Sequence, residues 1–242
     1  MMNSHIKIHS FPDRDTLVAE LGTAITNLLS TGITDNDRAS LAVSGGSTPV
    51  QLFKSLSNID LPWQKVDITL VDERWVSPDD PDSNENLVRT HLLQNKAAAA
   101  IFTGMKNSAK TASEGEDICS KQLQTIHRPF DVLLLGMGSD GHTASLFPGA
   151  AKLPQATDMN SGKICVGIAP VTAPHERMTL TLPVILASKQ IFLHITGQNK
   201  KDVLEQALGD GPTGEMPIRF ILRNQMIHKH KQKTNFSIYW SK

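Results

Sequence analysis

The sequence predicts an α/β fold, in one domain over residues 1–242, with a mostly parallel sheet layered by helices. Two observations lead to this expectation. Short apolar runs alternate along the 242 residues with segments whose apolar side chains recur at helical spacing. No Gly/Ser-rich linker, internal repeat or low-complexity block divides the chain, so a second domain is not indicated.

The beginning of the chain predicts two strands, each followed by a helix. Residues 6–11 (IKIHSF) are typical of a strand. A helix over 14–29 follows, because its apolar residues share one helical face: Leu17, Leu21, Ala24, Ile25 and Leu28. Residues 40–46 (SLAVSGG) predict a buried strand that enters a glycine turn. A helix over 49–57 comes next, with Thr48 as its N-cap and proline at its first position.

The middle of the chain predicts two further strands. VDITLVD, over 66–72, is an apolar strand followed by a polar loop and a helix over 84–93 (NENLVRTHLL). A second helix, around 112–126, precedes the apolar strand FDVLLLGMG over 130–138.

The last third of the chain continues the alternation. KICVGIAP (163–170) and QIFLHITG (190–197) are expected strands, and NKKDVLEQAL (199–208) is a helix. FSIYW (236–240) alternates like a final strand. The basic run HKHKQK (228–233) is typical of a solvated loop or a helix end.

Charge and composition exclude several classes of protein. The formal net charge is zero, from 24 basic and 24 acidic residues, which argues against nucleic acid or a membrane surface as partner. No apolar run reaches the roughly 18 residues of a membrane span, and the first residues lack a secretory signal, so we expect a cytoplasmic protein. Cys119 and Cys165 lie far apart and predict neither a disulfide framework nor a zinc site. The oligomeric state is left open between a monomer and a weak dimer.

Polar segments follow four of the expected strands. They are SGGSTP, DERW, GMGSDGH and TGQNK. In open α/β sheets, ligands bind beyond the carboxyl ends of the strands. We therefore expect the four segments to converge on one pocket.

The segment SGGSTP is suited to holding an anion. Gly45 and Gly46 let backbone N–H groups approach a ligand closely, and the helix that follows directs its positive end to the same point. Ser44, Ser47 and Thr48 can add hydroxyl donors. The segment lacks the pattern G-x-x-x-x-G-K-[ST], so it does not imply a nucleoside triphosphate. A tight turn before a capped helix is the alternative interpretation.

Charged residues near the other strand ends favour a phosphorylated ligand. Arg74, Arg177 and Lys200 are cations beside expected strands, where phosphate ligands are usually held. Each of them alone could be a surface charge, but together with SGGSTP they make a phosphorylated small molecule the expected ligand. Asp72 and Glu73 are either surface acids or pocket acids, and we place Asp72 among the expected substrate-binding residues.

The segment GMGSDGHTASLFPG matches the dinucleotide-binding pattern G-x-G-x-x-G at Gly136, Gly138 and Gly141. That fingerprint requires a full helix starting within the glycines and an acidic residue about 20 positions later. Here Pro148 stops the segment early, and after the next expected strand no carboxylate appears before Glu176. The pattern is therefore weak evidence for a dinucleotide.

The same segment favours acid–base chemistry instead. Asp140 can orient His142, and an imidazole ordinarily has a pKa near 6.5, which suits a general base at neutral pH. We expect Gly136 and Gly138 to let the chain turn sharply off its strand, and Gly141 to make room beside His142. For a developing oxyanion, both the backbone N–H groups of 136–138 and the side chain of Arg74 are candidates.

Five segments in this order resemble the family of 6-phosphogluconolactonases: VSGGSTP, VDERWVSPDDPDSN, LLLGMGSDGHTASLFPG, RMTLTLPV and ITGQNK. The resemblance spans roughly residues 40–205. It implies a fold shared with glucosamine-6-phosphate deaminases and ribose-5-phosphate isomerases. It also implies hydrolysis of a phosphorylated sugar lactone in the pentose phosphate pathway, with no metal and no cofactor. His142 would be the general base, Arg74, Arg177 and Lys200 basic pocket residues, and SGGST the phosphate-holding segment.

Two other functions remain as alternatives. The deaminases that share the D-G-H motif have GHIAFNEP where this chain has GHTASLFP, so their glutamate falls at Phe147, which cannot transfer a proton. A sugar-phosphate sensor without catalysis would ordinarily carry a DNA-binding domain, and this chain shows neither a basic excess nor a spare N-terminal domain.

Overall fold

Seven parallel strands form the main sheet of this computed structural model, which describes residues 6–227 and 234–242. The order is β1-β10-β9-β6-β2-β3-β5, and every neighbouring pair is parallel. The predicted α/β class with a mostly parallel sheet is confirmed. The strands are β1 (Lys7–Phe11), β2 (Ala39–Val43), β3 (Val66–Leu70), β5 (Ile101–Thr103), β6 (Val132–Leu135), β9 (Gln190–Thr196) and β10 (Asn235–Ser241).

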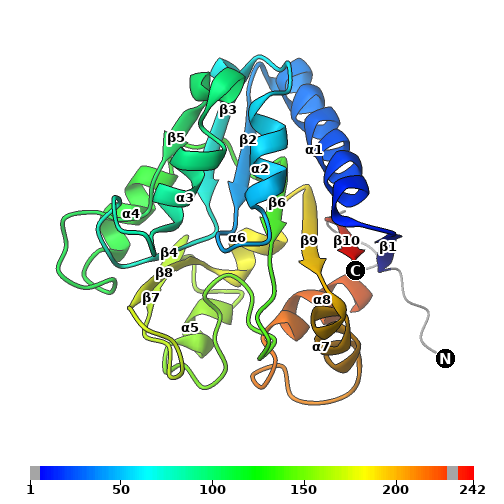
Figure 1. Cartoon of the computed structure of the whole chain (residues 1–242). Coiled ribbons are helices and arrows are strands. Elements are labelled where there is room, and N and C mark those ends of the chain that lie inside the picture. Colours follow the sequence, from blue (N-terminus) through cyan, green and yellow to red (C-terminus); the bar gives the residue numbers. More distant parts are fainter. Residues whose placement is uncertain (1–5, 228–233) are drawn as a thin grey trace.

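A second, antiparallel sheet of three strands lies beside the main one (Figure 1). Its order is β4-β8-β7, with β4 (Asp72–Arg74), β7 (Cys165–Ile168) and β8 (Arg177–Leu180). The expected strand over 66–72 is therefore wrong at its end, because Val71 changes partners: its N–H donates to Val43 of β2, and its carbonyl accepts from Leu180 of β8. The expected strand over 163–170 likewise belongs to this second sheet.

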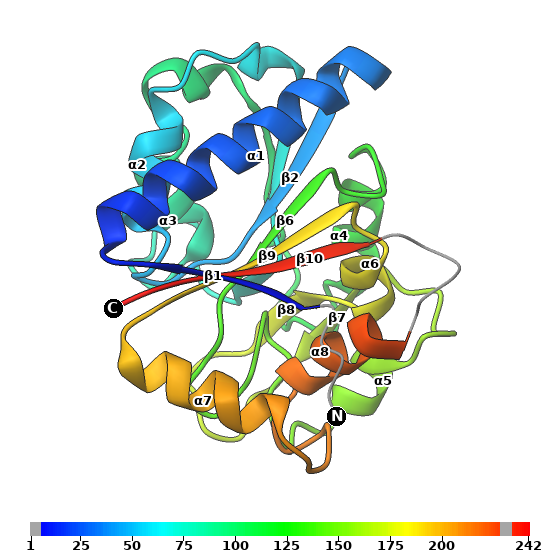
Figure 2. The ribbon, with the colours of Figure 1, turned by 90° about the vertical axis from the view of Figure 1, so that its right-hand side faces the viewer.

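Helices cover both faces of the main sheet. Figure 2 shows α1, α2 and α3 on one side and α7 and α8 on the other. The helices are α1 (Arg14–Asn36), α2 (Val50–Ser57), α3 (Asn84–His91), α4 (Glu116–Leu123), α5 (Leu153–Thr157), α6 (Leu182–Leu186), α7 (Gln198–Leu208) and α8 (Ile218–Ile227), with 3₁₀ turns at Trp63–Lys65 and Asn95–Ala99. Within the described residues, none of these helices is long and apolar enough to cross a membrane.

Several helix boundaries differ from the expectation. The helix expected around 112–126 is the shorter α4, and α3 ends before residue 93. Helix α1 continues to Asn36, and its last turns pass close to the neighbouring segments, because a Cβ at Gly32 would lie 3.0 Å from both Ala39 and Asp131. Helix α2 begins at Val50, its N-cap is Pro49, and no side chain caps it, so Thr48 is not the N-cap. The hydroxyl of Thr48 is consequently not used by the helix.

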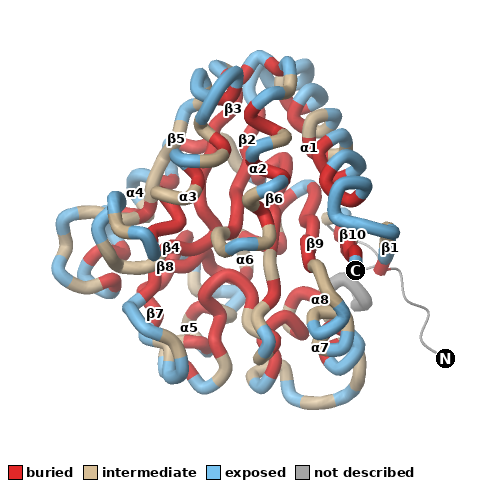
Figure 3. Tube along the Cα trace, in the orientation of Figure 1, coloured by how far each residue is buried: buried red, intermediate tan, exposed pale blue. Residues whose placement is uncertain are grey.

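The core lies between the sheet and its helices. All residues of β2, β3 and β6 are buried, as are the repeating Leu17, Leu21, Ile25 and Leu29 of α1 (Figure 3). One continuous cluster of apolar side chains joins both sheets. The basic run 228–233 lies outside the described residues.

Candidate active site

A cavity of about 340 Å³ lies where the main strands end. Ten of the eleven expected site residues line it: Ser44, Gly45, Gly46, Ser47, Thr48, Asp72, Arg74, His142, Arg177 and Lys200. Asp140 is the exception, and it contacts His142 instead. In Figure 1 the strands β2, β6 and β9 point their carboxyl ends toward this region, which explains why segments far apart in the sequence meet here.

The loop between β2 and α2 presents unused backbone donors to the cavity. Ser44 is fixed, because its N–H donates to Leu134 and its Oγ accepts from the N–H of Gly136 at 3.3 Å. The next four N–H groups, of residues 45–48, donate to no atom in the part of the chain that is described. Gly46 has φ of 92°, a left-handed conformation that glycine adopts readily. Free N–H groups before a helix N-terminus can hold an anion.

Two arginines lie side by side on the small sheet. Arg74 of β4 and Arg177 of β8 are direct cross-strand partners. Burial of Arg177 and the charge of Arg74 both lower the pKa of the Arg177 guanidinium. One nitrogen of each donates to a backbone carbonyl, of Asp82 and Pro174 respectively. Like charges on opposed residues repel each other, so this arrangement favours an anion between them.

Lys200 adds a third cation from the first turn of α7. Burial lowers the pKa of its ammonium group, and the negative charge of Asp140 opposes that change. Because Arg74, Arg177 and Lys200 come from three separate elements, they can surround a ligand rather than touch one side of it.

His142 and Asp140 form the expected pair. The Nδ1 atom of His142 lies 2.6 Å from Oδ1 of Asp140, and the same oxygen accepts from the backbone N–H of His142. Burial acts to raise the pKa of Asp140, but the hydrogen bonds from His142 outweigh it and hold that pKa below its ordinary value. An ionised Asp140 requires the ring proton on Nδ1, which leaves the lone pair of Nε2 free to accept a proton.

The space beside His142 is left by a different glycine from the one expected. A Cβ at Gly138 would lie 2.2 Å from ring atoms of His142, so Gly138 is the residue that makes room for the imidazole. The expectation for Gly141 was wrong, because its space is taken by Met216, which a Cβ would meet at 2.8 Å. Gly141 also has φ of 76°, which permits the turn.

No helix starts within these glycines. Among the described residues, the first helix after β6 is α5, at Leu153. The dinucleotide interpretation therefore fails on the structure as it did on the sequence.

Phe147 forms one wall beside the base. Its ring stacks on the His142 imidazole, with centroids 4.2 Å apart and planes at 30°, and the Arg177 guanidinium lies 5.9 Å from the same ring. The side chain is buried. It fixes the plane of the imidazole and supplies no group that titrates.

Of the backbone N–H groups expected to stabilise an oxyanion, only one is free to do so in the described chain. In the stretch 136–138, the N–H of Gly136 donates to Ser44 and that of Gly138 donates to the carbonyl of His142. The N–H of Met137 makes no hydrogen bond within the described chain. Asp72 is a poor donor site, because its carboxylate is buried and accepts from the hydroxyl of Ser145 at 2.6 Å.

Three polar residues of the cavity were missed from the sequence. One of them, Thr143, donates its hydroxyl to the carbonyl of Gly136. Asn84 stands at the start of α3 and donates to the carbonyl of Asp72, while its Oδ1 is buried without a partner in the described chain. His194 lies on β9, inside what looked like an ordinary apolar strand. A histidine within a buried strand was the only signal available for it.

Fold and cavity define an α/β protein with a polar ligand pocket at the carboxyl edge of a parallel sheet. More specifically, residues 12–231 match the model of one family, and the chain belongs to it: glucosamine-6-phosphate isomerases/6-phosphogluconolactonase. A 6-phosphogluconolactonase of Rhizobium meliloti (strain 1021) is 39% identical over 234 residues, covering 97% of this chain and 98% of that protein.

Solved structures agree with this placement. The crystal structure of a 6-phosphogluconolactonase from Shewanella baltica OS155 superposes with a TM-score of 0.93 at 43% identity, over 100% of both chains. A monomeric glucosamine-6-phosphate deaminase has the same fold, with a TM-score of 0.76 at 18% identity over 98% of both chains.

Proposed function

We propose that this chain hydrolyses 6-phosphoglucono-δ-lactone to 6-phosphogluconate. Its relatives are named for the same activity. The observation that carries the proposal is the His142–Asp140 pair, in which Nδ1 of His142 lies 2.6 Å from Oδ1 of Asp140. His142 lines a cavity that also contains three cationic side chains. The cations and the free N–H groups of residues 45–48 suit the phosphate. The imidazole suits a water molecule next to the lactone carbonyl.

The reaction follows from these groups. Nε2 of His142 takes a proton from water as its oxygen attacks the lactone carbonyl, and Asp140 stabilises the imidazolium. The N–H of Met137 or the guanidinium of Arg74 stabilises the oxyanion. When the ring C–O bond breaks, the imidazolium returns the proton to the leaving ring oxygen, which becomes a hydroxyl. The phosphate contacts orient the substrate at a distance from the reacting carbon.

The deaminase alternative lacks a proton carrier at the required place. Phe147 stacks on His142 where those relatives have glutamate, and a phenyl ring transfers no proton. Among residues 6–227 and 234–242, no group of three or more His, Cys, Asp or Glu side chains is arranged to hold a metal ion. Hydrolysis without metal or cofactor stays a prediction, as does the cytoplasmic location.

Turnover of two lactones tests the function. Freshly made 6-phosphogluconolactone should be hydrolysed well above its spontaneous rate, both before and after dialysis against EDTA. Unphosphorylated gluconolactone should be a poor substrate. Comparable efficiency on both lactones would contradict the phosphate assignment, and an EDTA-sensitive rate restored by Zn²⁺ or Mg²⁺ would contradict the metal-free mechanism.

A further inference from the structure

His194 has a role in the cavity that the mechanism above does not use. It lies on β9, lines the cavity, and is only 3% exposed. Its neighbour in register on β10 is Tyr239, and on the other side β9 pairs with β6, which ends at the catalytic loop. The strand therefore places His194 in the cavity wall, with its backbone paired on both sides.

The charge and tautomer of His194 follow from its surroundings. Burial and the positive charge of Arg14 lower the pKa of the imidazole to about 4, so the ring is neutral at working pH. Nδ1 is buried and has no hydrogen-bond partner within the described residues. A buried N–H without an acceptor is rarer in proteins than an unpaired acceptor, so the ring proton belongs on Nε2. The charged or titratable groups that share the cavity wall with it are Asp72, Arg74, His142, Arg177 and Lys200.

We infer that His194 is a substrate-positioning residue, whose Nε2–H donates a hydrogen bond to an oxygen of the bound sugar phosphate. A neutral hydrogen-bond donor of this kind orients the bound ligand without adding charge to a cavity that already contains three cations. The acceptor is either a sugar hydroxyl or a phosphate oxygen, which present the same chemistry to an N–H group. The inference rests on the proposed function for the identity of the ligand.

Ser188 provides a matched control. It precedes the other end of the same strand, and its hydroxyl is likewise buried without a partner in the described chain. It does not line the cavity. A change at Ser188 therefore disturbs a comparable buried polar group without touching the ligand.

The test is equilibrium binding of 6-phosphogluconate, measured by calorimetry at pH 6.5 and pH 8. His194→Phe should weaken binding about 3- to 10-fold, the effect of losing one neutral hydrogen bond. His194→Gln, which keeps an N–H donor, should bind within about twofold of the unchanged protein. Ser188→Ala should bind normally. The loss should be equal at both pH values, because a group with a pKa of about 4 is neutral at both. His194→Leu replaces His194→Phe if that variant does not fold.

Fragments locate the acceptor oxygen. If His194→Phe also weakens binding of inorganic phosphate, the acceptor is on the phosphate; if phosphate binding is unchanged, it is on the sugar. The inference is overturned if His194→Phe binds 6-phosphogluconate normally, if His194→Gln loses as much as His194→Phe, or if Ser188→Ala loses as much. Failure of the unchanged protein to hydrolyse the lactone would instead refute the proposed function, whatever the binding results.

Discussion

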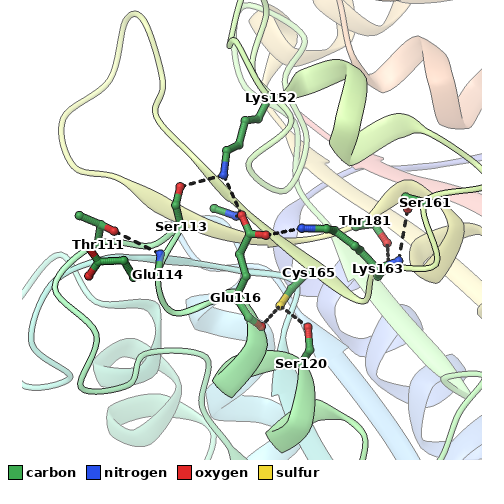
Figure 4. Close-up of polar contacts among 11 residues, drawn as sticks. Thr111, Ser113, Glu114, Glu116, Ser120, Lys152, Ser161, Lys163, Cys165 and Thr181 are labelled. Atoms are coloured by element: carbon green, nitrogen blue, oxygen red, sulfur yellow. Dashed lines mark hydrogen bonds and ion pairs between the residues drawn. The ribbon is translucent and has the colours of Figure 1, made fainter.

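Two clusters of charged side chains in this molecule differ in how far their charges are paired within the protein. The Glu116 cluster consists of Glu116, Lys152, Lys163 and the N–H of Gly167. The Glu116 carboxylate is buried and accepts from Lys152 at 2.8 Å, from Lys163 at 2.6 Å and from Gly167 at 3.0 Å. Figure 4 shows the two lysines reaching it from different segments. Every charged side chain in this cluster is paired with an opposite charge of the protein.

The active-site cavity leaves several of its polar groups without partners in the described chain. Arg74 and Arg177 are cross-strand partners of like charge, and Nε of Arg177 is buried with no partner in the described chain. Oδ1 of Asn84 and Nδ1 of His194 are likewise buried and have no hydrogen-bond partner in the described chain. Buried polar groups are normally paired, so these three atoms mark the cavity wall as a place where hydrogen bonding within the chain is incomplete. The groups available to a ligand are the free N–H groups of residues 45–48, which line the same cavity. The difference separates structural charge from functional charge, and each prediction below tests one side of it.

The largest expected effect is on the base. His142→Ala should lower kcat about 10²–10⁴-fold, because it removes the proton acceptor, while binding of 6-phosphogluconate stays largely intact. Asp140→Asn should lower the same parameter by less.

Stopped-flow hydrolysis, corrected for spontaneous lactone opening, measures this effect. His91→Ala, on α3 and outside the cavity, is the control and should retain full activity. A normal kcat in His142→Ala would make His142 structural, and Asp72 would be the next base to examine.

The next effect separates binding from stability. Arg177→Met keeps most of the side-chain length but removes the charge, so KM should rise about 10-fold or more through loss of a charge-assisted hydrogen bond. Its Tm should change little, because removing a buried charge and its repulsion by Arg74 is offset by losing the attraction of nearby carboxylates. Arg38→Met is the matched control: Arg38 pairs with Asp67 outside the cavity, so it should lose stability and keep its KM. A lowered Tm together with a normal KM in Arg177→Met would contradict the assignment.

Glu116→Gln should behave in the opposite way to Arg177→Met, with a loss of stability and no loss of activity. Its lysine partners are 38% and 41% exposed, which weakens each ion pair, so we expect a loss of about 1–2 kcal/mol and a Tm lower by roughly 2–8 °C. The kcat/KM value should not change. Lys152 and Lys163 lower the pKa of Glu116 below its ordinary 4.5, although burial opposes them.

The pH dependence of stability follows from that direction. A carboxyl whose pKa is lower in the folded state stabilises the protein above about pH 4.5, and the contribution disappears as the pH falls through the folded-state pKa. The Tm values of Glu116→Gln and of the unchanged protein should therefore converge in acid. A Tm difference that stays constant between pH 7 and pH 3 would show that the ion pairs are not its source.

The sequence predicts the local parts of the site and not its long-range pairings. Residues 44–48, Asp72 and Lys200 could be placed because each follows an expected strand, and parallel strands end at one edge. The pairing of Arg74 with Arg177 was not predictable, since it depends on Val71 leaving β3 for a second sheet.

Other sites depend on contacts between segments that no local pattern encodes. The role of Gly141 was misinterpreted because its space is filled by Met216, which lies 75 positions later in the sequence. His194 and Asn84 escaped notice for the same reason. An apolar strand and a helix start look alike whether or not their one polar side chain meets a cavity.

The smallest expected effect concerns the packing of the base. Phe147→Leu preserves an apolar wall but removes the flat face that lies 4.2 Å from the imidazole. Aromatic stacking contributes about 0.5–1.5 kcal/mol, so kcat should fall roughly 2- to 10-fold as the ring of His142 samples other orientations. KM should change little, because the phosphate contacts are untouched.

Two further variants show whether the flat ring is the cause. Phe147→Tyr keeps the ring and should restore kcat. Phe192→Leu removes a different buried ring, packed edge-on against Tyr239 and outside the cavity, so it should affect Tm only. If Phe147→Leu raises KM as much as it lowers kcat, or if Phe147→Tyr fails to restore kcat, the ring does not act by orienting His142. Phe147 would then belong with the structural side chains of the Glu116 type rather than with the catalytic cavity.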